Sequence, residues 1–448
     1  MKLYDKTLST VYEQGRTINL WNIFFPKLTE LVSISLLGSI HSMLMANFDQ
    51  EAAIAVSVGS QLVSIIQSIF CIFSTGHLII SSIYLGANDR ASAGTSASSV
   101  LAISIVLSLI AGILLAALPQ PFMRLMHLEG KAFQYGCTYF SIMMAFSVIS
   151  VMISCFNSFL VSIGQAKCVL IINLIRNVLS VIFGYIVLFR PFSIPLHGVS
   201  GVAIGRVLSQ AISVMIAIVF VLRCKCPMKR NLSYKAILRA GKIGLPGSMG
   251  GLAYGFSQIV ASSMISSLGV AMISAKVFAN NILGFVTPFS YSVAEGNSIL
   301  MGRYKGQNNY KCADMLFKQN LSLAVFMNVI LVILIYIFRI PLFSLFTKDA
   351  EVLKLIEQVV FVDIFVEAAR AVNHIAERSL TANGDVRFVT ILSTTSCWAI
   401  SIGLGWALGI LLDIGIIGFW IAFAADEFIR CYGYLLRWRS GRWKSIKL

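Results

Sequence analysis

Long apolar stretches alternate with short polar links along the whole chain of 448 residues. Each stretch is long enough to cross a bilayer as a helix, because about 20 apolar residues span the hydrocarbon core. The stretch 270–301 is the least regular, since it contains Lys276, Pro288 and Glu295. The pattern predicts twelve membrane-crossing helices, at approximately 20–46, 53–80, 97–118, 134–160, 169–189, 198–222, 243–268, 270–301, 319–338, 358–380, 389–411 and 416–436.

The composition is typical of an all-α polytopic membrane protein and excludes a soluble enzyme. Apolar residues make up 57% of the chain and charged residues 12%, about half of the roughly 25% found in soluble domains. The mean hydropathy of +0.83 leaves too few charges to cover a water-facing surface of this size. The nine cysteines lie mostly inside apolar runs and form no disulfide or zinc pattern. No cleavable signal peptide is visible in the polar first residues.

Basic residues are concentrated on one side of the predicted topology. The net charge is +16. Twelve crossings place both termini on one side, and the links and tails of that side hold 22 Lys and Arg residues, against six on the other. Cytoplasmic loops of membrane proteins carry such an excess. We therefore expect both termini in the cytoplasm, and we expect the basic segment 223–242 to be an amphipathic cytoplasmic linker.

The two halves of the chain repeat at an offset of 220 residues. The segment Tyr84–Asn88 recurs as Tyr304–Asn308, and the same offset pairs Pro26 with Pro246. Further pairs are Leu160 with Leu380, Gly164 with Gly384 and Lys167 with Arg387; near the end the offset is 217 and pairs Gly198 with Gly415 and Gly201 with Gly418. The repeat predicts an N-terminal lobe (1–222) and a C-terminal lobe (243–448), each of six helices.

A duplicated six-helix unit favours a secondary transporter. Because each repeat crosses the membrane an even number of times, both enter it the same way round, and a central cleft is expected between them. A channel would more often assemble from separate subunits. Enzymatic activity is not expected, since His374-Ile-Ala-Glu377 lacks the second histidine of a zinc-binding His-Glu-x-x-His helix. No phosphate-binding Gly-x-x-x-x-Gly-Lys loop is present, so an ion or substrate gradient must supply the energy.

The tenth span carries the densest set of ionisable residues, namely Asp363, Glu367, Arg370, His374 and Glu377. Spacings of 4, 3, 4 and 3 place them on one stripe of a helix, about 21 Å long. Each ionisable residue at bilayer depth costs about 2.5–3.5 kcal/mol on insertion scales. The stripe must therefore face the cleft or other polar groups, not lipid.

Two interpretations of this stripe remain open. It is either a fixed network in which Arg370 neutralises Glu367, or a site where a carboxylate exchanges a proton or binds Na⁺. We expect the second role for Asp363 and Glu367, which lie near the middle of the membrane.

Polar residues elsewhere in the spans are sparser. Lys27 and Glu30 are spaced to pair with each other, and His41 stands alone in the outer third of the first span. Lys276 and Glu295 are 19 residues apart, about 28 Å along a helix, so they cannot pair directly. Further candidates for the cleft or for hydrogen bonding between helices are Tyr254 and Gln258 in the seventh span, and Asn173, Arg176 and Asn177 in the fifth.

The tenth span contains a run from Glu367 through Arg370 to Asn373, and Leu380–Phe388 follows it. The last span contains Gly415–Ala422, with Asp426, Glu427, Arg430 and Arg437–Trp443 after it. The first set resembles a tenth-span signature of the MATE (multidrug and toxic compound extrusion) transporters, and the second resembles the close of the bacterial members of that family. The resemblance implies twelve helices in two lobes, a V-shaped cleft, and export coupled to inward H⁺ or Na⁺ in the cell inner (plasma) membrane.

The sequence departs from the family pattern at two positions. Members usually place a coupling aspartate fifteen residues after the first-span proline, where this chain has His41. Many place a glutamate eight residues after the seventh-span proline, where this chain has Tyr254. Coupling is therefore expected first at Glu367, second at Asp363 and third at His41.

The preferred hypothesis is a monomeric, ion-coupled exporter of amphipathic or organic-cation-like small molecules. It needs no cofactor and no metal beyond a coupling ion, which would be H⁺, or Na⁺ at Asp363 and Glu367. Its partners are the substrate and the lipid bilayer, with no nucleic acid. The alternatives are a flippase for lipid-linked precursors on a related fold, which favours a strongly cationic cleft, and a receptor or structural membrane protein without transport.

Overall fold

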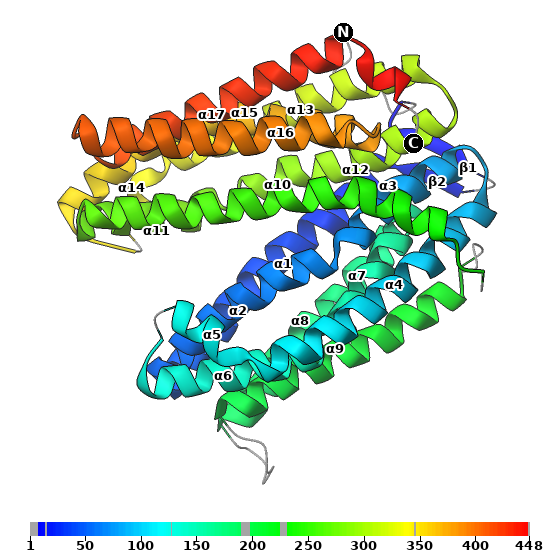
Figure 1. Ribbon diagram of the computed structural model, residues 1–448. Helices are drawn as coiled ribbons and strands as arrows, with labels where there is room; N and C mark the ends of the chain where they lie inside the picture. Colours follow the sequence, from blue (N-terminus) through cyan, green and yellow to red (C-terminus); the bar gives the residue numbers. More distant parts are fainter. Residues whose placement is uncertain are drawn as a thin grey trace. The chain divides into compact units, whose positions relative to one another are not determined.

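The computed structural model describes residues 8–13, 16–126, 128–189, 198–224, 231–344 and 346–446. Figure 1 shows an almost wholly helical chain. The first half contains the strands β1 (Thr10–Glu13) and β2 (Arg16–Asn19) and the helices α1 (Leu20–Phe48), α2 (Gln50–Phe70), α3 (Ile72–Gly86), α4 (Arg90–Ala117), α5 (Pro119–Leu125), α6 (Gly130–Ala145), α7 (Ser147–Ser162), α8 (Ala166–Phe189) and α9 (Gly198–Leu222).

The second half contains α10 (Tyr234–Ser267), α11 (Val270–Leu283), α12 (Thr287–Gly306), α13 (Tyr310–Ile337), α14 (Arg339–Phe343), α15 (Ala350–Ala382), α16 (Val386–Ser396) and α17 (Ile416–Arg439). Two π-helical segments, η1 (Cys397–Leu404) and η2 (Ala407–Leu411), prolong α16, and a short 3₁₀ helix, η3 (Arg442–Ser445), follows α17.

All twelve predicted spans are present as helices, which confirms the predicted all-α architecture. Eight are single helices, and four are divided into consecutive segments. Among the described residues, six continuous helices and two bent pairs are long and apolar enough to cross a membrane. The helices α1, α10, α15 and α17 are not among them. Of these, α15 and α17 carry the charged residues described below.

The predicted single span 270–301 is in fact bent. Helices α11 and α12 meet at an angle of 48°, and α6 and α7 meet at 51°. Pro288 lies in the first turn of α12, where a proline is tolerated because the N–H that it lacks would have no partner within the helix. The proline therefore marks the start of a new helix, and the stretch that seemed irregular in the sequence contains this break.

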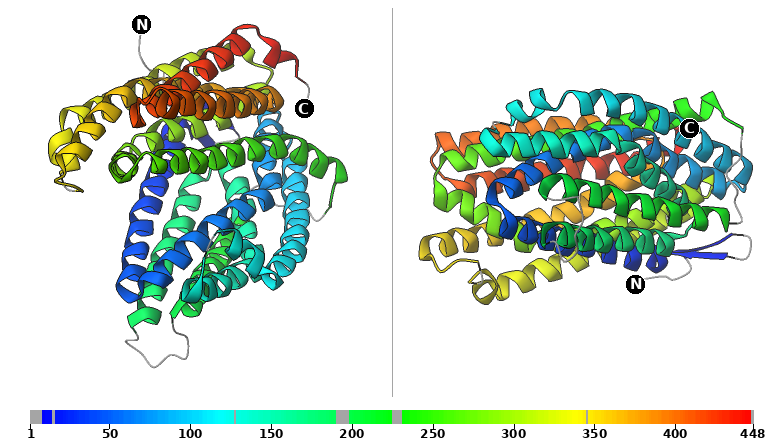
Figure 2. Two further views of the ribbon diagram at one scale, coloured as in Figure 1. Left: turned by 60° about the vertical axis from the view of Figure 1, so that its left-hand side comes forward. Right: turned by 90° about the horizontal axis from the view of Figure 1, so that it is seen from below.

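A small hairpin precedes the first span, where only a polar tail was expected. β1 and β2 are antiparallel, with Thr10 opposite Asn19; the strands are visible in the right-hand view of Figure 2. The hydroxyl of Tyr304 donates to the carbonyl oxygen of Leu8 (2.9 Å), and the amide of Gln319 donates to Ser9 Oγ (2.6 Å). The N-terminal segment is thus attached to α12 and α13.

The chain forms two compact units. The N-unit comprises Phe25–Ser248, and the C-unit comprises Met1–Phe24 together with Met249–Leu448. Their boundaries lie within α1 and α10, next to Pro26 and Pro246, and so differ from the predicted lobe limits. Proline removes a helix hydrogen bond and bends the helix, so the two sides of each proline can pack in different units.

The predicted linker 223–242 is partly built into the N-unit, although residues 225–230 lie outside the described part. From Tyr234 onward the segment forms the first turns of α10. The guanidinium of Arg239 donates to the hydroxyl of Tyr84 (2.8 Å), and the backbone N–H of Ser233 donates to Ser99 Oγ (2.8 Å). Its cytoplasmic location stays a prediction.

The internal repeat is visible in the backbone. Asn88 and Asn308, 220 residues apart, have φ angles of 61° and 56°, a left-handed conformation that asparagine tolerates better than most residues. The next residue in each repeat caps a helix, since Asp89 accepts from the N–H of Ser92, and Asn309 from the N–H of Cys312. The same local sequence thus builds the same turn twice.

Candidate functional site

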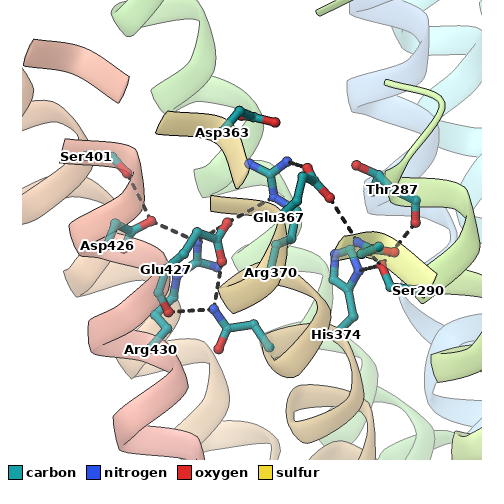
Figure 3. Close-up of polar contacts among 12 residues, drawn as sticks. Thr287, Ser290, Asp363, Glu367, Arg370, His374, Ser401, Asp426, Glu427 and Arg430 are labelled. Atoms are coloured by element: carbon teal, nitrogen blue, oxygen red, sulfur yellow. Dashed lines mark hydrogen bonds and ion pairs between the residues drawn. The ribbon is translucent and has the colours of Figure 1, made fainter. Parts of the chain in front are cut away.

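The C-unit contains a cluster of buried charges on α15 and α17. These helices pack along each other, and Figure 3 shows their charged side chains pointing toward one another. The four carboxylates, Asp363, Glu367, Asp426 and Glu427, are at most 4% exposed. Two guanidiniums, Arg370 and Arg430, pair with three of them. The fully ionised cluster therefore has two more negative charges than positive ones.

Glu367 is completely enclosed and fully paired. Its side chain is 0% exposed and forms an ion pair with Arg370, one turn further along α15. The amide of Asn328 donates to its other oxygen (2.9 Å). This ion pair is the contact that the first of the two interpretations requires, in which Arg370 neutralises Glu367.

Glu427 joins the two helices. Its Oε1 accepts from Arg370 Nε (3.2 Å) and pairs with Arg430 (2.9 Å). Its Oε2 accepts from the amide of Asn373 (2.7 Å). Such a buried carboxylate needs several partners because burial removes its hydration. Glu427 was not predicted as a site residue, although a charge within the apolar twelfth span was a visible signal.

Asp426 is held by hydroxyl groups and by Arg430. Ser396 Oγ donates to one carboxylate oxygen (2.5 Å), and Ser401 Oγ donates to the other (2.9 Å). Arg430 Nη2 also donates to the second oxygen (2.8 Å). This second missed acid therefore connects α17 to the end of α16 and to η1.

Asp363 differs from the other acids because one of its oxygens has no partner. Trp420 Nε1 donates to Oδ1 (3.0 Å). Oδ2 is buried and has no hydrogen-bond partner among the described residues. The residue as a whole is only 4% exposed. A buried carboxylate oxygen without a donor is costly, so this oxygen is available to a proton, a cation or a ligand.

A pocket of about 280 Å³ opens beside the cluster, entirely within the C-unit. Of the residues predicted from the sequence, it brings together Tyr254, Gln258, Lys276, Asp363 and Arg370. The aromatic side chains of Trp420 and Phe423, and the carboxylates of Asp426 and Glu427, also line it. Glu367 is not part of the lining and reaches the pocket only through Arg370.

The remaining predicted residues lie elsewhere. His374 Nδ1 is hydrogen-bonded to Ser290 Oγ (3.0 Å), and Glu295 pairs with Arg378 (3.6 Å). Glu377 is only partly buried, although it continues the stripe of α15. Asn177 lies in the N-unit, where its side-chain oxygen accepts from Arg176 Nε (3.4 Å). The side chain of His41 lies outside the described residues.

Metal binding by a cluster of protein ligands has no support in the described part of the chain. No group of three or more His, Cys, Asp or Glu side chains is arranged there to hold a metal ion.

In the N-unit, the helices equivalent to α15 and α17 pack together without these charges. At offsets of 220 and 217, Arg370 and Glu427 correspond to Ser150 and Gln210. Ser150 Oγ donates to Gln210 Oε1 (2.8 Å), in place of the ion pair. Glu367, Asp426 and Arg430 correspond to serines, at positions 147, 209 and 213. The equivalent positions of the N-unit thus carry neutral groups, and the charged contact between these helices is instead a hydrogen bond from Arg206 to the hydroxyl of Tyr139 (2.6 Å). The ion pairs of the C-unit are therefore not needed to form the fold.

Comparison with known proteins gives consistent results. A family model, MatE, matches residues 26–186 and again residues 246–407, two matches that begin 220 residues apart. A curated relative is the uncharacterized transporter YisQ of Bacillus subtilis, 26% identical over 96% of this chain and 95% of its own. Another is the probable multidrug resistance protein NorM of Thermotoga maritima, 22% identical over 94% of this chain and 91% of its own.

Solved structures share the fold over nearly the whole chain. A mutant of the Vibrio cholerae MATE transporter VcmN has a TM-score of 0.85 at 17% identity, covering 95% of this chain and 97% of its own. A transporter of the MOP superfamily from Pyrococcus furiosus, described as having a binding pocket of reversed polarity, has a TM-score of 0.84 at 17% identity, covering 95% and 96%. The two-lobed, twelve-helix architecture of these structures is also that of this chain.

Proposed function

The chain belongs to the MatE family, the family of the MATE membrane transporters, and we propose on that basis that it exports amphipathic, organic-cation-like small molecules in exchange for H⁺ or Na⁺. The observation that carries this proposal is the charge cluster of the C-unit. The ionised acids of the cluster outnumber its guanidiniums by two, and still by one when Lys276 of the adjoining pocket is counted. Such a negative surplus in a buried site attracts a cation. Because the N-unit has neutral groups at the positions equivalent to these ion pairs, the fold itself does not require them.

The geometry favours Asp363 over Glu367 as the group that takes up the ion. Asp363 lines the pocket and has an oxygen without a partner, whereas Glu367 has both oxygens bound. In this proposal Glu367 acts through Arg370, which it shares with Glu427. His41, the third candidate, stays a prediction.

The flippase alternative is less well supported. A lipid-linked precursor carries a pyrophosphate, which would require a strongly cationic site. The cluster of the C-unit carries two more carboxylates than guanidiniums. The family match also favours a transporter over a receptor or structural protein. We propose a monomer in the inner (plasma) membrane, with no cofactor besides the coupling ion.

The proposal is tested by transport of ethidium, an aromatic cation, in proteoliposomes. Each ion gradient is imposed separately on the wild-type protein and on the variants Asp363→Asn and Glu367→Gln. We expect at least one gradient to drive transport by the wild type and both variants to lose at least about 90% of the driven rate, since a neutral amide does not exchange a proton or balance a cation.

Glu357→Gln is the matched control. Glu357 lies on the same helix, α15, but its side chain is 47% exposed and pairs with Arg339 outside the cluster. We expect this variant to transport at the wild-type rate and all variants to be expressed at similar levels. Full activity of both Asp363→Asn and Glu367→Gln would refute the assignment, and transport unaffected by either gradient would refute antiport.

A further inference from the structure

Two arginines lie within membrane-spanning helices of the N-unit, Arg176 on α8 and Arg206 on α9. Both side chains are partly buried. Within the part of the chain that the structure describes, neither guanidinium forms an ion pair with a carboxylate. They are close enough for their positive charges to repel each other. Because charges at this depth are normally paired, the two guanidiniums together favour a negative partner.

The acids of the N-unit do not supply that partner. Its sequence contains five, and four of them lie at the starts of helices, namely Asp49, Glu51, Asp89 and Glu129. The fifth, Glu30, has both oxygens bound, since it pairs with Lys27 (3.2 Å) and accepts from Asn173 Nδ2 (2.7 Å). It attracts Arg176 only from beyond ion-pair distance. The interior of the N-unit therefore carries a positive surplus, opposite in sign to that of the charge cluster in the C-unit.

Hydroxyl groups from two further helices surround Arg206. Its Nη1 donates to the hydroxyl of Tyr139 on α6 (2.6 Å) and to Ser60 Oγ on α2 (3.4 Å), and the two hydroxyl oxygens lie 3.1 Å apart. Because a guanidinium only donates, the Tyr139 proton can be donated to Ser60, which leaves the Ser60 proton for another acceptor. Tyr139 is fully buried, whereas Ser60 and Arg206 are partly exposed. The site thus presents N–H and O–H donors to an acceptor that enters from outside.

The repeat indicates that the fold does not need this contact. At offsets of 217 and 220, Arg206 and Tyr139 correspond to Phe423 and Val359. Both of these residues belong to one hydrophobic cluster of the C-unit. An apolar contact therefore occupies the equivalent place, and the guanidinium and hydroxyl groups are additions of the N-unit.

We propose that the N-unit binds a small anion, a halide or a single carboxylate group, at Arg206 and Arg176, with the Ser60 hydroxyl as a further donor. The anion would offset the repulsion between the two guanidiniums. A small ligand is expected because α8 and α9 pack along each other. The inference does not depend on the transport function proposed above, since it concerns equilibrium binding by the other unit.

The test measures chloride binding by the line width of the ³⁵Cl⁻ NMR signal, with purified full-length protein in phosphatidylcholine nanodiscs. Gluconate replaces chloride at constant ionic strength. For the wild type we expect excess line width that saturates with chloride and is removed by bromide. We expect Arg206→Gln and Arg176→Gln each to raise the chloride Kd at least about tenfold, because one hydrogen bond to a charged group is worth that factor or more. Arg206→Lys keeps the charge and should raise the Kd less.

Arg124→Gln is the matched control, because Arg124 is an exposed arginine of the N-unit at the end of α5. We expect it to bind chloride like the wild type. Competition with acetate identifies the anion. Displacement at concentrations similar to chloride would assign the site to a carboxylate, and displacement by bromide alone would assign it to a halide; either result supports an anion site.

Four results would overturn the proposal: no bromide-sensitive line width in the wild type, an unchanged Kd in the glutamine variants, an equal loss of binding in Arg124→Gln, or loss of the signal when the nanodiscs contain phosphatidylglycerol. The last result would assign the site to a lipid phosphate. The two glutamine variants change different helices, so one that fails to fold leaves the other as the test. If both fail, a chloride Kd in Arg206→Lys equal to that of the wild type would overturn the role of Arg206.

Discussion

At the residue scale, Arg370 connects the acids of the cluster. It pairs with Glu367 on its own helix and with Glu427 on α17. Removing one partner of a buried ion pair leaves the other charge uncompensated, at a cost of about 3–5 kcal/mol. Replacing the whole set by neutral groups can be much less costly. The N-unit contains such a neutral set at the equivalent positions, Ser147, Ser150 and Gln210.

We therefore predict that Arg370→Ser strongly destabilises the protein and that a triple variant is partly rescued. The triple variant copies the N-unit, with Glu367→Ser, Arg370→Ser and Glu427→Gln. The comparison is matched, because both variants lose the same arginine side chain. Thermal unfolding in detergent should give a higher midpoint for the triple variant than for Arg370→Ser. A triple variant as unstable as the single one would show that lost packing, and not unpaired charge, sets the cost.

The sequence predicted part of this site. The stripe on α15 was visible because helical periodicity places residues three and four apart on one face. The partners from α17 were not predicted, because pairing between distant spans depends on packing that periodicity does not report. Two features could be found only from the structure. Glu427 forms ion pairs with both Arg370 and Arg430, and Asp363 Oδ2 has no hydrogen-bond partner among the described residues.

At the scale of elements, hydropathy located the spans but not their internal breaks. The bend between α6 and α7 occurs at Phe146, where neither proline nor glycine signals it. The bend after α11 had a signal in Pro288. The hairpin β1–β2 was missed because a search for long apolar runs does not detect short strands in a polar segment. The β-branched residues on both sides of Gln14-Gly15 were a signal for it.

Close contact between α3 and the start of α10 gives an element-scale prediction. A Cβ atom added at Gly244 would overlap the backbone carbonyl oxygen of Ile72. Gly244→Ala should therefore force the helices apart and cost on the order of 1–3 kcal/mol. Gly251→Ala is the control on the same helix, because nothing lies within 4 Å of its added Cβ.

We expect the thermal midpoint to fall for Gly244→Ala and to be unchanged or slightly raised for Gly251→Ala, since alanine is the better helix former. Equal midpoints for the two variants would mean that α3 and α10 do not approach as closely as described.

At the scale of the whole molecule, the distribution of basic residues predicts the topology. The excess of 22 basic residues over six predicts that both termini lie in the cytoplasm. A C-terminal green fluorescent protein fusion in a bacterial host should then be fluorescent, and a C-terminal alkaline phosphatase fusion should be inactive. An active phosphatase with a dark fluorescent protein would reverse the assigned orientation.

The internal duplication is the property of the whole molecule on which the proposed role of the C-unit depends. Two copies of one fold, one with ion pairs and one with neutral groups at the equivalent positions, separate what the architecture needs from what the C-unit adds to it. The copies also explain why the sequence alone predicted the twelve spans and their division into two lobes. Glycine and proline positions at a fixed offset are preserved even where side-chain chemistry has diverged, as at Arg370 and Ser150.

In the proposed mechanism, ion and substrate exchange at the acids of the C-unit. Its most direct test is ion release on ligand binding, measured with purified protein when ethidium is added. Proton release is followed in weakly buffered solution, and Na⁺ release is followed with radioactive Na⁺. We predict that ethidium displaces one of the two ions from the wild type and from Glu357→Gln but from neither Asp363→Asn nor Glu367→Gln. Ethidium binding that releases neither ion from the wild type, or equal release from all four proteins, would contradict the account.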